Sequence, residues 1–334
     1  MLHFVIVGIL IIVVSFLTYW GVNIMWVLPV EASAQAVPID WLWDVQMIAL
    51  SFLFALIVVP MFYSLIVFRR RKGETGDGEH FEGNTRLEIT WTVLPLFAVL
   101  AVAYIGAGNL AETRRADPDA MIVKVTGIQW SWSFEYPEYG VISDELHLPV
   151  DRQVLLQMTS NDVIHSFWVP EFRVKQDLVP GRITELRITP TIVGNYKVSC
   201  AELCGTSHAY MIKPVIVTEQ PGFDSWMAVQ VELAKEASQT PEGRGKALVA
   251  ANGCAACHSI NGAAGIGPTW FGLAGSQVTL SGGATVTADD AYLAESIKTP
   301  QAKIVAGFEA QQMISFSFTD EQIADIVAYL KTLR

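Results

Sequence analysis

Three long runs without a charged residue mark the N-terminal third of the chain, at residues 1–30, 45–68 and 89–110. Each run is longer than the ~20 apolar residues with which a helix crosses the hydrocarbon core of a bilayer. The first run is either a further membrane span or a secretory signal, because small residues at 32–36 resemble a cleavage site. It lacks a basic start and exceeds the length of a signal core. We therefore favour an uncleaved span over 1–30, followed by a transmembrane helical hairpin over 41–110.

A basic cluster sets the orientation of these spans. Arg69, Arg70, Arg71 and Lys72 directly follow the second run, and the positive-inside rule places such a loop on the cytoplasmic side. The third span then delivers everything after residue 111 to the outer side of the membrane. A cleaved first run would change only the position of the N-terminus, so this orientation holds in either case.

From residue 121 onward the pattern changes to short apolar or alternating runs. They lie at 122–125, 154–158, 185–188 and 215–217, and Pro and Gly turns such as those at 180–181 and 193–195 separate them. Several short strands at this spacing are typical of a β-sandwich or barrel. Residues 111–220 suffice for one such domain, which takes about 100 residues.

Beyond the predicted β domain the pattern changes again. Residues 221–241 run from Pro221-Gly222 into Glu232, Lys235, Glu236, Ser238 and Thr240-Pro241, and predict a solvated connector that is partly helical. Residues 242–334 form a further unit, whose last segment, 320–333, predicts an amphipathic helix with Ile323, Ile326, Val327 and Leu330 on one face. In chain order the pattern thus predicts a membrane anchor, a β domain and an α-helical domain.

Composition narrows the functional classes. Apolar residues make up 51% of the chain and charged residues only 16%, against about 25% charged residues in a soluble protein. The net charge of -11 repels phosphate backbones, which argues against nucleic-acid binding and favours cationic partners. The four cysteines form two close pairs in the C-terminal part of the chain, and both pairs carry candidate chemistry.

The first cysteine pair stands in a cluster of soft metal ligands. Residues 200–211 contain two thiols, an imidazole and a thioether, at Cys200, Cys204, His208 and Met211. This combination favours copper, and one histidine from an upstream loop, for which His165 is the best candidate, would complete the set. The alternatives are a Cys200–Cys204 disulfide, which an oxidising compartment permits, and a zinc site, which leaves Met211 without a role.

The second pair has the spacing of a covalent haem attachment. Cys254, Cys257 and His258 form a C-x-x-C-H motif, in which two thioether bonds hold the haem and the histidine binds its iron. A thiol redox motif is the alternative, but it needs no following histidine and usually belongs to a βαβ unit. Met313 is the only methionine after Met227, so it is the candidate for the second axial ligand. A Met/His pair suits an electron carrier.

Residues 242–334 resemble the class I cytochromes c, whose terminal helix packs on the first helix, here about residues 243–252. The resemblance implies that the carbonyl of Pro268, in a Gly267-Pro268 pair, accepts a hydrogen bond from His258 and fixes its orientation. A simple turn is the other interpretation of such a pair, and the two are compatible. Ile314 departs from the family, in which proline often follows the methionine ligand.

The copper motif carries a second resemblance. The pattern C-x-E-x-C-x3-H-x2-M at 200–211, with the stretches at 87–95, 127–136, 162–167 and 175–182, resembles subunit II of the haem–copper cytochrome c oxidases over residues 41–220. That family implies a cupredoxin-like fold that holds a dinuclear copper centre, CuA. The implied ligands are two bridging thiolates, one imidazole for each ion and two weak outer ligands: Cys200, Cys204, His165, His208, Met211 and the carbonyl of Glu202.

The same resemblance implies roles for three more side chains. The Glu202 carboxylate would hold magnesium at the contact with the catalytic subunit, since hard cations prefer oxygen ligands. Trp130 would receive electrons near the copper site, although its spacing from Trp132 equally fits two core residues on one side of a strand. Glu88 would lie at the mouth of a proton channel in the neighbouring subunit. By itself it is a helix-start carboxylate stabilised by the helix dipole.

These features predict a multidomain membrane protein with transmembrane α-helices, a cupredoxin-like β-sandwich and an all-α cytochrome c domain. The resemblances imply subunit II of a caa3-type oxidase in a bacterial cell membrane, multi-pass, with both metal domains outside. It would take electrons from an external donor through haem c to CuA and pass them to subunit I, with subunit III as a further partner. Because the haem domain belongs to the same chain as the copper domain, it would deliver electrons to CuA intramolecularly.

This chain alone is not the site of oxygen reduction. It has six histidines, of which the two metal sites use three, and no span carries the histidines of an intramembrane haem–copper centre. A membrane-anchored electron shuttle outside any oxidase is the alternative, and co-purification with a many-span haem protein distinguishes the two. A quinol-oxidase subunit II would lack the copper ligands, and a nitrous oxide reductase would need a repeated propeller.

Overall fold

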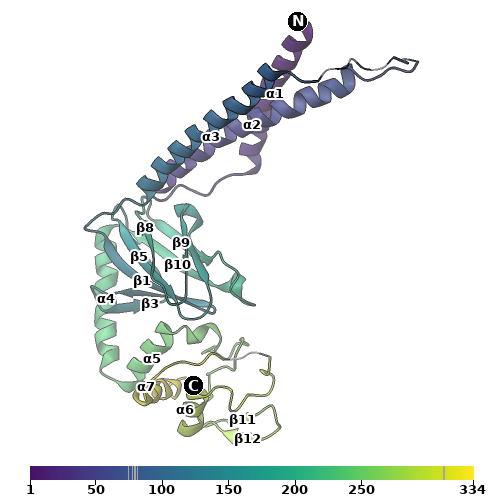
Figure 1. The fold of residues 1–334 in the computed structure, drawn as a ribbon. Helices are drawn as coiled ribbons and strands as arrows, with labels where there is room; N and C mark the ends of the chain where they lie inside the picture. Colours follow the sequence, from purple (N-terminus) through teal and green to yellow (C-terminus); the bar gives the residue numbers. More distant parts are fainter. Residues whose placement is uncertain (74, 77, 79, 81, 311–312) are drawn as a thin grey trace. The chain divides into compact units, whose positions relative to one another are not determined.

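The computed structural model describes residues 1–334 except 74, 77, 79, 81, 311 and 312, and it forms two units that divide after residue 115. The first unit consists of long apolar helices (Figure 1): α1 (Leu2–Met25), α2 (Ala36–Val67) and α3 (Thr85–Thr113). All three are long and apolar enough to cross a membrane. Their side chains are mostly exposed, as expected of surfaces that meet lipid or other membrane helices.

Two polar contacts join these helices. The His3 Nδ1 of α1 lies 2.7 Å from the Tyr63 hydroxyl of α2, and the Asn109 side chain of α3 donates to the Pro38 carbonyl at 2.8 Å. Hydrogen bonds of this kind hold helices together where lipid offers no competing partner. The predicted transmembrane segments are thus helices in the structure.

The second unit begins with two five-stranded sheets (Figure 1). The first has the order β3 (Val141–Ser143), β2 (Ser131–Tyr136), β1 (Met121–Ile128), β5 (Val154–Ser160) and β8 (Thr184–Ile188). The second has the order β4 (Leu146–Pro149), β10 (Ile212–Thr218), β9 (Gly194–Cys200), β6 (His165–Trp168) and β7 (Lys175–Leu178). Within each sheet one pair is parallel, β1 with β5 and β4 with β10. The predicted β-sandwich is confirmed.

Alternation along the strands builds the core of this sandwich. In β5, Val154, Leu156 and Met158 are fully buried, while the residues between them are partly exposed. Successive side chains of a strand point to opposite faces, so one face of the sheet is buried. The aromatic side chains of Trp132 and Phe167 meet edge to face across this core, with ring centroids 5.9 Å apart.

The connector to the C-terminal domain is one continuous helix, α4 (Gln220–Ser238). The sequence predicted a solvated connector, but Phe223 and Met227 of this helix are buried. The Trp226 indole stacks on the His147 imidazole of β4, with centroids 3.8 Å apart and planes inclined by 10°. Three aromatic or sulfur-containing side chains on one face of α4 therefore fix it to the β-sandwich.

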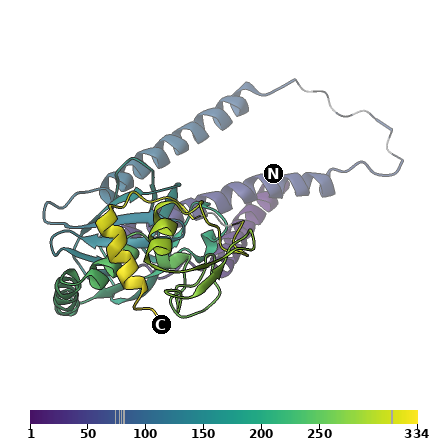
Figure 2. The same cartoon turned by 90° about the horizontal axis from the view of Figure 1, so that it is seen from below.

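The C-terminal domain is mainly helical. Its elements are α5 (Pro241–Ala251), the 3₁₀ turn η3 (Cys254–Ala256), α6 (Asp290–Lys298), α7 (Asp320–Leu330) and a small hairpin of β11 (Gln277–Thr279) and β12 (Thr285–Thr287). The hairpin is the one departure from the predicted all-α domain in the part of it that the structure describes. Figure 2 shows α7, in yellow, beside α6. A Thr319–Gln322 capping box begins α7.

The predicted packing of the first helix on the last depends on one glycine. A Cβ added to Gly245 of α5 would lie 2.0 Å from the Asp325 carbonyl oxygen of α7, so only glycine permits this approach. Beside it, the Arg244 guanidinium donates two hydrogen bonds to the Asp325 carboxylate, at 2.8 and 2.7 Å. This paired geometry compensates the charge of Asp325, which is only 6% exposed.

Candidate metal centres

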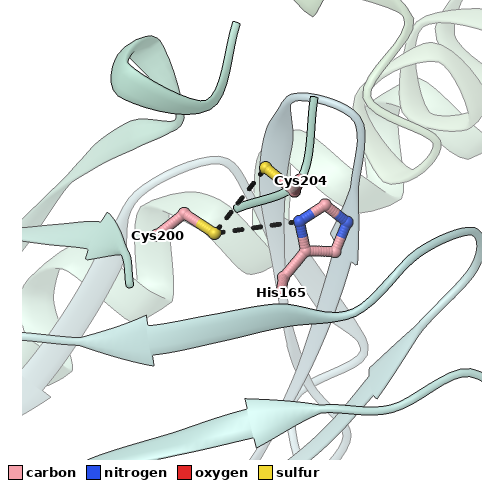
Figure 3. A group of neighbouring side chains, drawn as sticks. All are labelled: His165, Cys200 and Cys204. Carbon is pink, nitrogen blue, oxygen red and sulfur yellow. Dashed lines mark hydrogen bonds between the residues drawn. The ribbon is translucent and has the colours of Figure 1, made fainter. Parts of the chain in front are cut away.

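Two strands and the loop after β9 position the candidate copper ligands (Figure 3). Cys200 ends β9, and His165 begins β6. The two strands are neighbours in the sheet, where Phe167 of β6 pairs with Cys200. The loop then returns Cys204, and Met211 follows the short 3₁₀ turn η2 (His208–Tyr210). Ligand atoms of His165, Cys200 and Cys204 lie within 4.8 Å of one another. Residues 35 positions apart in sequence thus form one buried cluster.

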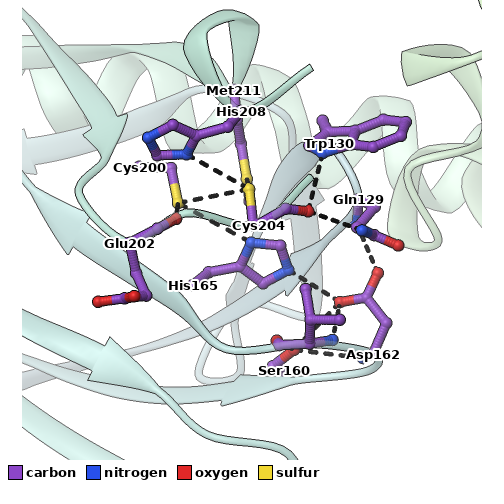
Figure 4. Close-up of polar contacts among 11 residues, drawn as sticks. Gln129, Trp130, Ser160, Asp162, His165, Cys200, Glu202, Cys204, His208 and Met211 are labelled. Atoms are coloured by element: carbon purple, nitrogen blue, oxygen red, sulfur yellow. Dashed lines mark hydrogen bonds and ion pairs between the residues drawn. The ribbon is translucent and has the colours of Figure 1, made fainter. Parts of the chain in front are cut away.

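The geometry of the cluster fits a sulfur-bridged site (Figure 4). The Sγ atoms of Cys200 and Cys204 are 3.8 Å apart and both cysteines are free, so they form no disulfide. His165 Nδ1 lies 3.9 Å from Cys200 Sγ, and His208 Nδ1 lies 3.5 Å from Cys204 Sγ. Each thiol therefore has its own imidazole, and these nitrogen and sulfur atoms, once deprotonated, are the donors that a soft metal prefers.

Two weaker ligands complete the set. The Met211 thioether lies 3.9 Å from Cys204 Sγ, and the Glu202 carbonyl oxygen lies 3.2 Å from Cys200 Sγ. All six ligands that the sequence analysis named for copper are therefore in one cluster. Thiolate, imidazole and thioether together suit copper, and the thioether distinguishes this donor set from the usual zinc sites.

The thiols and the imidazole shift one another's protonation. Burial opposes the charged form of Cys200, but hydrogen bonds from His165 and from backbone groups lower the pKa of this thiol to about 6. Burial and the neighbouring Cys200 charge raise the pKa of Cys204. The protein alone thus favours one thiolate, and a second needs a bound cation, which deprotonates its ligand thiols.

Asp162 orients the His165 ligand. Its Oδ1 lies 2.8 Å from His165 Nε2, which leaves Nδ1 facing the sulfur atoms. Burial opposes the His165 cation, but the bond to Asp162 raises the pKa of His165 to about 9. The backbone N–H groups of Gln129 and Val163 also donate to Asp162, at 2.7 Å each. Such a carboxylate fixes the tautomer and direction of a metal-binding imidazole.

Trp130 and Trp132 have different surroundings. Trp132 is 1% exposed and donates from Nε1 to the Met211 carbonyl at 3.2 Å. Trp130 lies in the turn between β1 and β2 rather than on a strand, and its Nε1 donates to the Cys204 carbonyl at 3.1 Å. The two indoles therefore do not share one face of a strand. Trp130 lies against the loop between β9 and β10, residues 201–211, which we call the copper loop. Trp132 is bonded to Met211 of this loop from the core.

The second candidate centre surrounds the C-x-x-C-H motif. A cavity of about 560 Å³ is lined by residues that include His258, Trp270, Leu293 and Met313. Its walls are mainly apolar, and Cys254 and Cys257 line a smaller cavity that shares His258, Gly267, Pro268, Phe308 and Met313 with it. This arrangement fits a haem, and burial raises the pKa of Cys254 to about 11. Burial raises the pKa of Cys257 in the same way, so both thiols are neutral at pH 7.

His258 is oriented for iron binding. Its Nδ1 lies 2.7 Å from the Pro268 carbonyl, so Nδ1 donates and Nε2 keeps its lone pair. Burial lowers the pKa of His258, against the effect of the Pro268 bond. Trp270 stacks on the imidazole, with centroids 4.7 Å apart and planes inclined by 10°. A Cβ on Gly267 would lie 2.8 Å from the same ring, so this position requires glycine.

Glu88 lies in the first turn of α3. Its Oε1 accepts a hydrogen bond from the Asn84 backbone N–H at 3.3 Å, and the Asn84 side chain accepts from the Leu87 N–H at 3.2 Å. This reciprocal pattern caps the N-terminus of a helix. The local contacts of Glu88 are therefore those of a capping residue.

Four residues that shape the two centres have no role at either centre predicted from the sequence: Gln129, Asp162, Trp132 and Trp270. The Asp162–His165 spacing was a usable signal, because a carboxylate three residues before a ligand histidine can bond its second nitrogen. The other three act through contacts between segments far apart in sequence. Their positions become meaningful only in the folded chain.

A soft copper-ligand set in a β-sandwich, a haem-binding cavity and a membrane anchor define a membrane-bound electron-transfer protein. Known families match these parts in order: "Cytochrome C oxidase subunit II, transmembrane domain" at residues 18–106, its "periplasmic domain" at 141–220, and "Cytochrome c" at 243–334. A cytochrome c oxidase subunit 2 from Synechocystis sp. is 35% identical over 278 residues, 69% of this chain and 82% of that protein. The chain belongs to the cytochrome c oxidase subunit 2 family.

Further relatives agree in name. The cytochrome c oxidase subunit 2 of Alkalihalophilus pseudofirmus is 30% identical over 306 residues, which is 88% of each chain. The crystal structure of the periplasmic domain of subunit II of cytochrome oxidase from Bradyrhizobium japonicum is similar to 36% of this chain and 97% of that one, at 33% identity and a TM-score of 0.33.

Membership confirms several predictions. The chain is a subunit of a haem–copper oxidase, an oxidoreductase, fused to a cytochrome c domain. The family implies CuA copper, the cytochrome c domain implies haem c, and both fit the donor sets described above. The transmembrane and periplasmic matches indicate membrane anchoring with an external domain, and the family indicates subunit I as a partner.

Proposed function

We propose that this subunit receives electrons from an external donor at haem c, passes them to CuA and delivers them to the oxygen-reducing subunit I. One observation carries the proposal: Trp130 borders both centres. It lines a small cavity of about 110 Å³ together with Cys254, His258 and Met313, and its Nε1 donates to the carbonyl of the copper ligand Cys204. Bound copper and haem would each supply one-electron storage.

The residues around copper favour a small change of geometry on electron transfer. Cys200 and Met211 are joined by a backbone hydrogen bond of 3.1 Å from the Cys200 N–H to the Met211 carbonyl. His165 is fully buried and bonded to Asp162. Ligands held by strands and by second hydrogen bonds have little freedom to move. A rigid ligand set of this kind supports fast electron exchange.

The residues around the haem favour a carrier of electrons. The Pro268 carbonyl orients the His258 ring, burial favours its neutral form, and Met313 lines the same cavity. We propose Met313 as the second axial ligand, because a Met/His pair raises the potential of the iron. Trp270 lines the cavity beside His258 and stacks on its ring.

The remaining assignments follow the family resemblance. We propose a multi-pass protein of a bacterial cell membrane, with subunit III as a further neighbour and both metal domains outside. The exposed Glu202 carboxylate beside the copper loop would bind magnesium at the interface with subunit I, where a hard cation finds oxygen ligands. Glu88 would serve a proton channel of the neighbouring subunit in addition to capping α3.

Replacement of the bordering tryptophan tests the route. In the purified oxidase, a light-activated reductant in solution gives one electron to haem c after a light pulse, and the reduction of CuA is followed by its near-infrared absorbance. We expect Trp130→Phe to slow this step roughly 10- to 100-fold, because the variant loses the Nε1 hydrogen bond to the Cys204 carbonyl and rates depend steeply on such positioning. Trp168→Phe, a matched change on the partly exposed β6 of the same domain, leaves the rate unchanged. Equal rates in both variants would overturn the route.

Metal analysis of the same preparation tests the class of protein. We expect two coppers for each haem c iron in addition to the copper of the haem–copper centre in subunit I, with one unpaired electron shared by those two coppers in the EPR spectrum. Co-purification with a many-span haem protein is expected of an oxidase subunit. Recovery of the chain without such a partner would favour the independent electron shuttle.

A further inference from the structure

We propose that Gly253 is a positioning residue for electron transfer, because it lets the haem segment, residues 254–258, approach the turn that carries Trp130. This inference rests on the proposed function, since it assumes that electrons cross between the two centres at that turn. The turn comprises residues 128–131, between β1 and β2. Its two ends meet Gly253, and its two middle residues are bonded to the copper loop and also line the small cavity beside Cys254.

The middle of the turn is bonded to the copper loop. Gln129 Nε2 and Trp130 Nε1 both donate to the Cys204 carbonyl, at 2.6 and 3.1 Å. The Gln129 backbone N–H donates to Asp162, which in turn holds the ligand His165. Figure 4 shows these bonds converging beside the sulfur atoms. The position of the turn relative to the copper ligands is therefore fixed by three hydrogen bonds.

The ends of the turn meet Gly253. Ile128 and Ser131 form the last pair of the β1–β2 ladder, and Gly253 directly precedes the haem-binding Cys254. A Cβ on Gly253 would lie 2.5 Å from Ile128 Cγ2 and 3.2 Å from Ser131 Cβ. Ile128 is only 3% exposed and β-branched, so its methyl group has little freedom to withdraw. A side chain at Gly253 would therefore push the two segments apart.

The backbone conformation adds a second reason for glycine. Gly253 has φ of +64°, in the left-handed region that glycine adopts without strain. This conformation ends α5 and turns the chain into η3, which begins at Cys254. The same residue thus directs the first attachment cysteine and sets how closely it approaches the turn.

Helix α4 provides the second point at which the haem domain is held. Trp226 stacks on His147, and Phe223 is fully buried beside Tyr136, with ring centroids 6.4 Å apart. Only two residues separate the end of α4 at Ser238 from the start of α5 at Pro241. The haem segment therefore reaches the turn on a short path that begins at a fixed helix. No diffusional search precedes each transfer.

The test compares two glycines with the same backbone requirement. Gly253→Ala is matched by Gly272→Ala, which has φ of +67° and no atom within 4 Å of its added Cβ. The full oxidase is used, and transfer from haem c to CuA is followed after a light pulse. We expect Gly253→Ala to slow the transfer roughly 10- to 100-fold and Gly272→Ala to leave it unchanged. Equal rates in the two variants overturn the proposal.

A readout independent of turnover accompanies the rate. Hydrogen exchange at the amides of residues 128–131 is expected to accelerate in Gly253→Ala and to stay at the wild-type rate in Gly272→Ala. The double variant Gly253→Ala/Ile128→Ala removes the methyl group at 2.5 Å, so we expect it to recover both readouts. Failure of the double variant to recover either one contradicts the close approach as the cause.

A change on the copper side covers the case in which Gly253→Ala fails to bind haem. Ser131→Val adds bulk at the same contact without altering the attachment segment, and Ser133→Val is its control, because the two serines are 8% and 7% exposed in the same strand. Slower transfer in Ser131→Val alone supports the proposal. If Trp130→Phe slows transfer but neither Gly253→Ala nor Ser131→Val does, the route stands and the role of Gly253 is wrong.

Discussion

Asp162 Oδ1 lies 2.8 Å from Nε2 of His165, and this bond leaves the opposite ring nitrogen facing the sulfur of Cys200. The carboxylate is held in turn by the backbone N–H groups of Gln129 and Val163. One acidic side chain thereby joins a metal ligand to the turn that borders the haem segment.

Removal of this carboxylate is expected to weaken the copper site. Asp162→Ala frees the His165 ring to rotate, so we predict a 10- to 100-fold loss of copper affinity, the usual effect of removing such a partner. Asp162→Asn retains one acceptor and should lose less. Competition with a copper chelator measures the affinity, and Asp177→Ala, on strand β7, is the control. Wild-type affinity in Asp162→Ala would show that the bond does not orient the ligand.

The two thiols are expected to react differently when copper is removed. The pKa of Cys200 is lowered to about 6, whereas that of Cys204 is raised. Only the thiolate is nucleophilic, so alkylation of Cys200 should increase as the pH rises through 6, and Cys204 should react much more slowly at pH 7. Peptide mass spectrometry of the copper-depleted chain measures both rates. Equal rates at the two thiols would contradict this asymmetry.

The Asp162–His165 pair predicts how the stability of the copper-free protein depends on pH. Bonding to Asp162, against burial, raises the pKa of His165 from 6.5 to about 9. The stabilisation is therefore complete below pH 6.5 and is lost as the pH rises through 9. Unfolding of the copper-free chain at a series of pH values measures this loss, and Asp162→Ala should flatten the profile between pH 6.5 and 9. An unchanged slope in that variant would remove the pair as its cause.

The α5–α7 crossing predicts a large effect of one methyl group. Gly245→Ala places Cβ against the Asp325 carbonyl, and overpacking of this kind destabilises a domain by about 1–3 kcal/mol. Thermal unfolding followed by haem absorbance measures the change. Gly282→Ala, where no atom lies within 4 Å of the new methyl, should unfold like the wild type. Equal stability of the two variants would mean that the helices separate without cost.

Much of this architecture is predictable from local pattern. Uncharged runs indicate the membrane helices, alternation in β5 indicates a half-buried strand, and the motifs at Cys200 and Cys254 indicate the two centres. The packing of α4 was not predictable, because the partners of Trp226 are His147 and Tyr136 in distant strands. Gly253 had no local signal either. Glycine is required there because of a contact with Ile128, which is 125 positions earlier in the chain.

The helical nature of the connector constrains how a haem domain can be joined to a copper domain. Each residue of an α-helix turns the chain by about 100° and advances it by about 1.5 Å. One residue inserted into α4 after Met227 would thus rotate the start of α5 by more than a quarter turn relative to the fixed Trp226. Gly253 would then face a different part of the β-sandwich. The join between the domains therefore has an angular phase as well as a length, and only insertions close to whole helical turns preserve it.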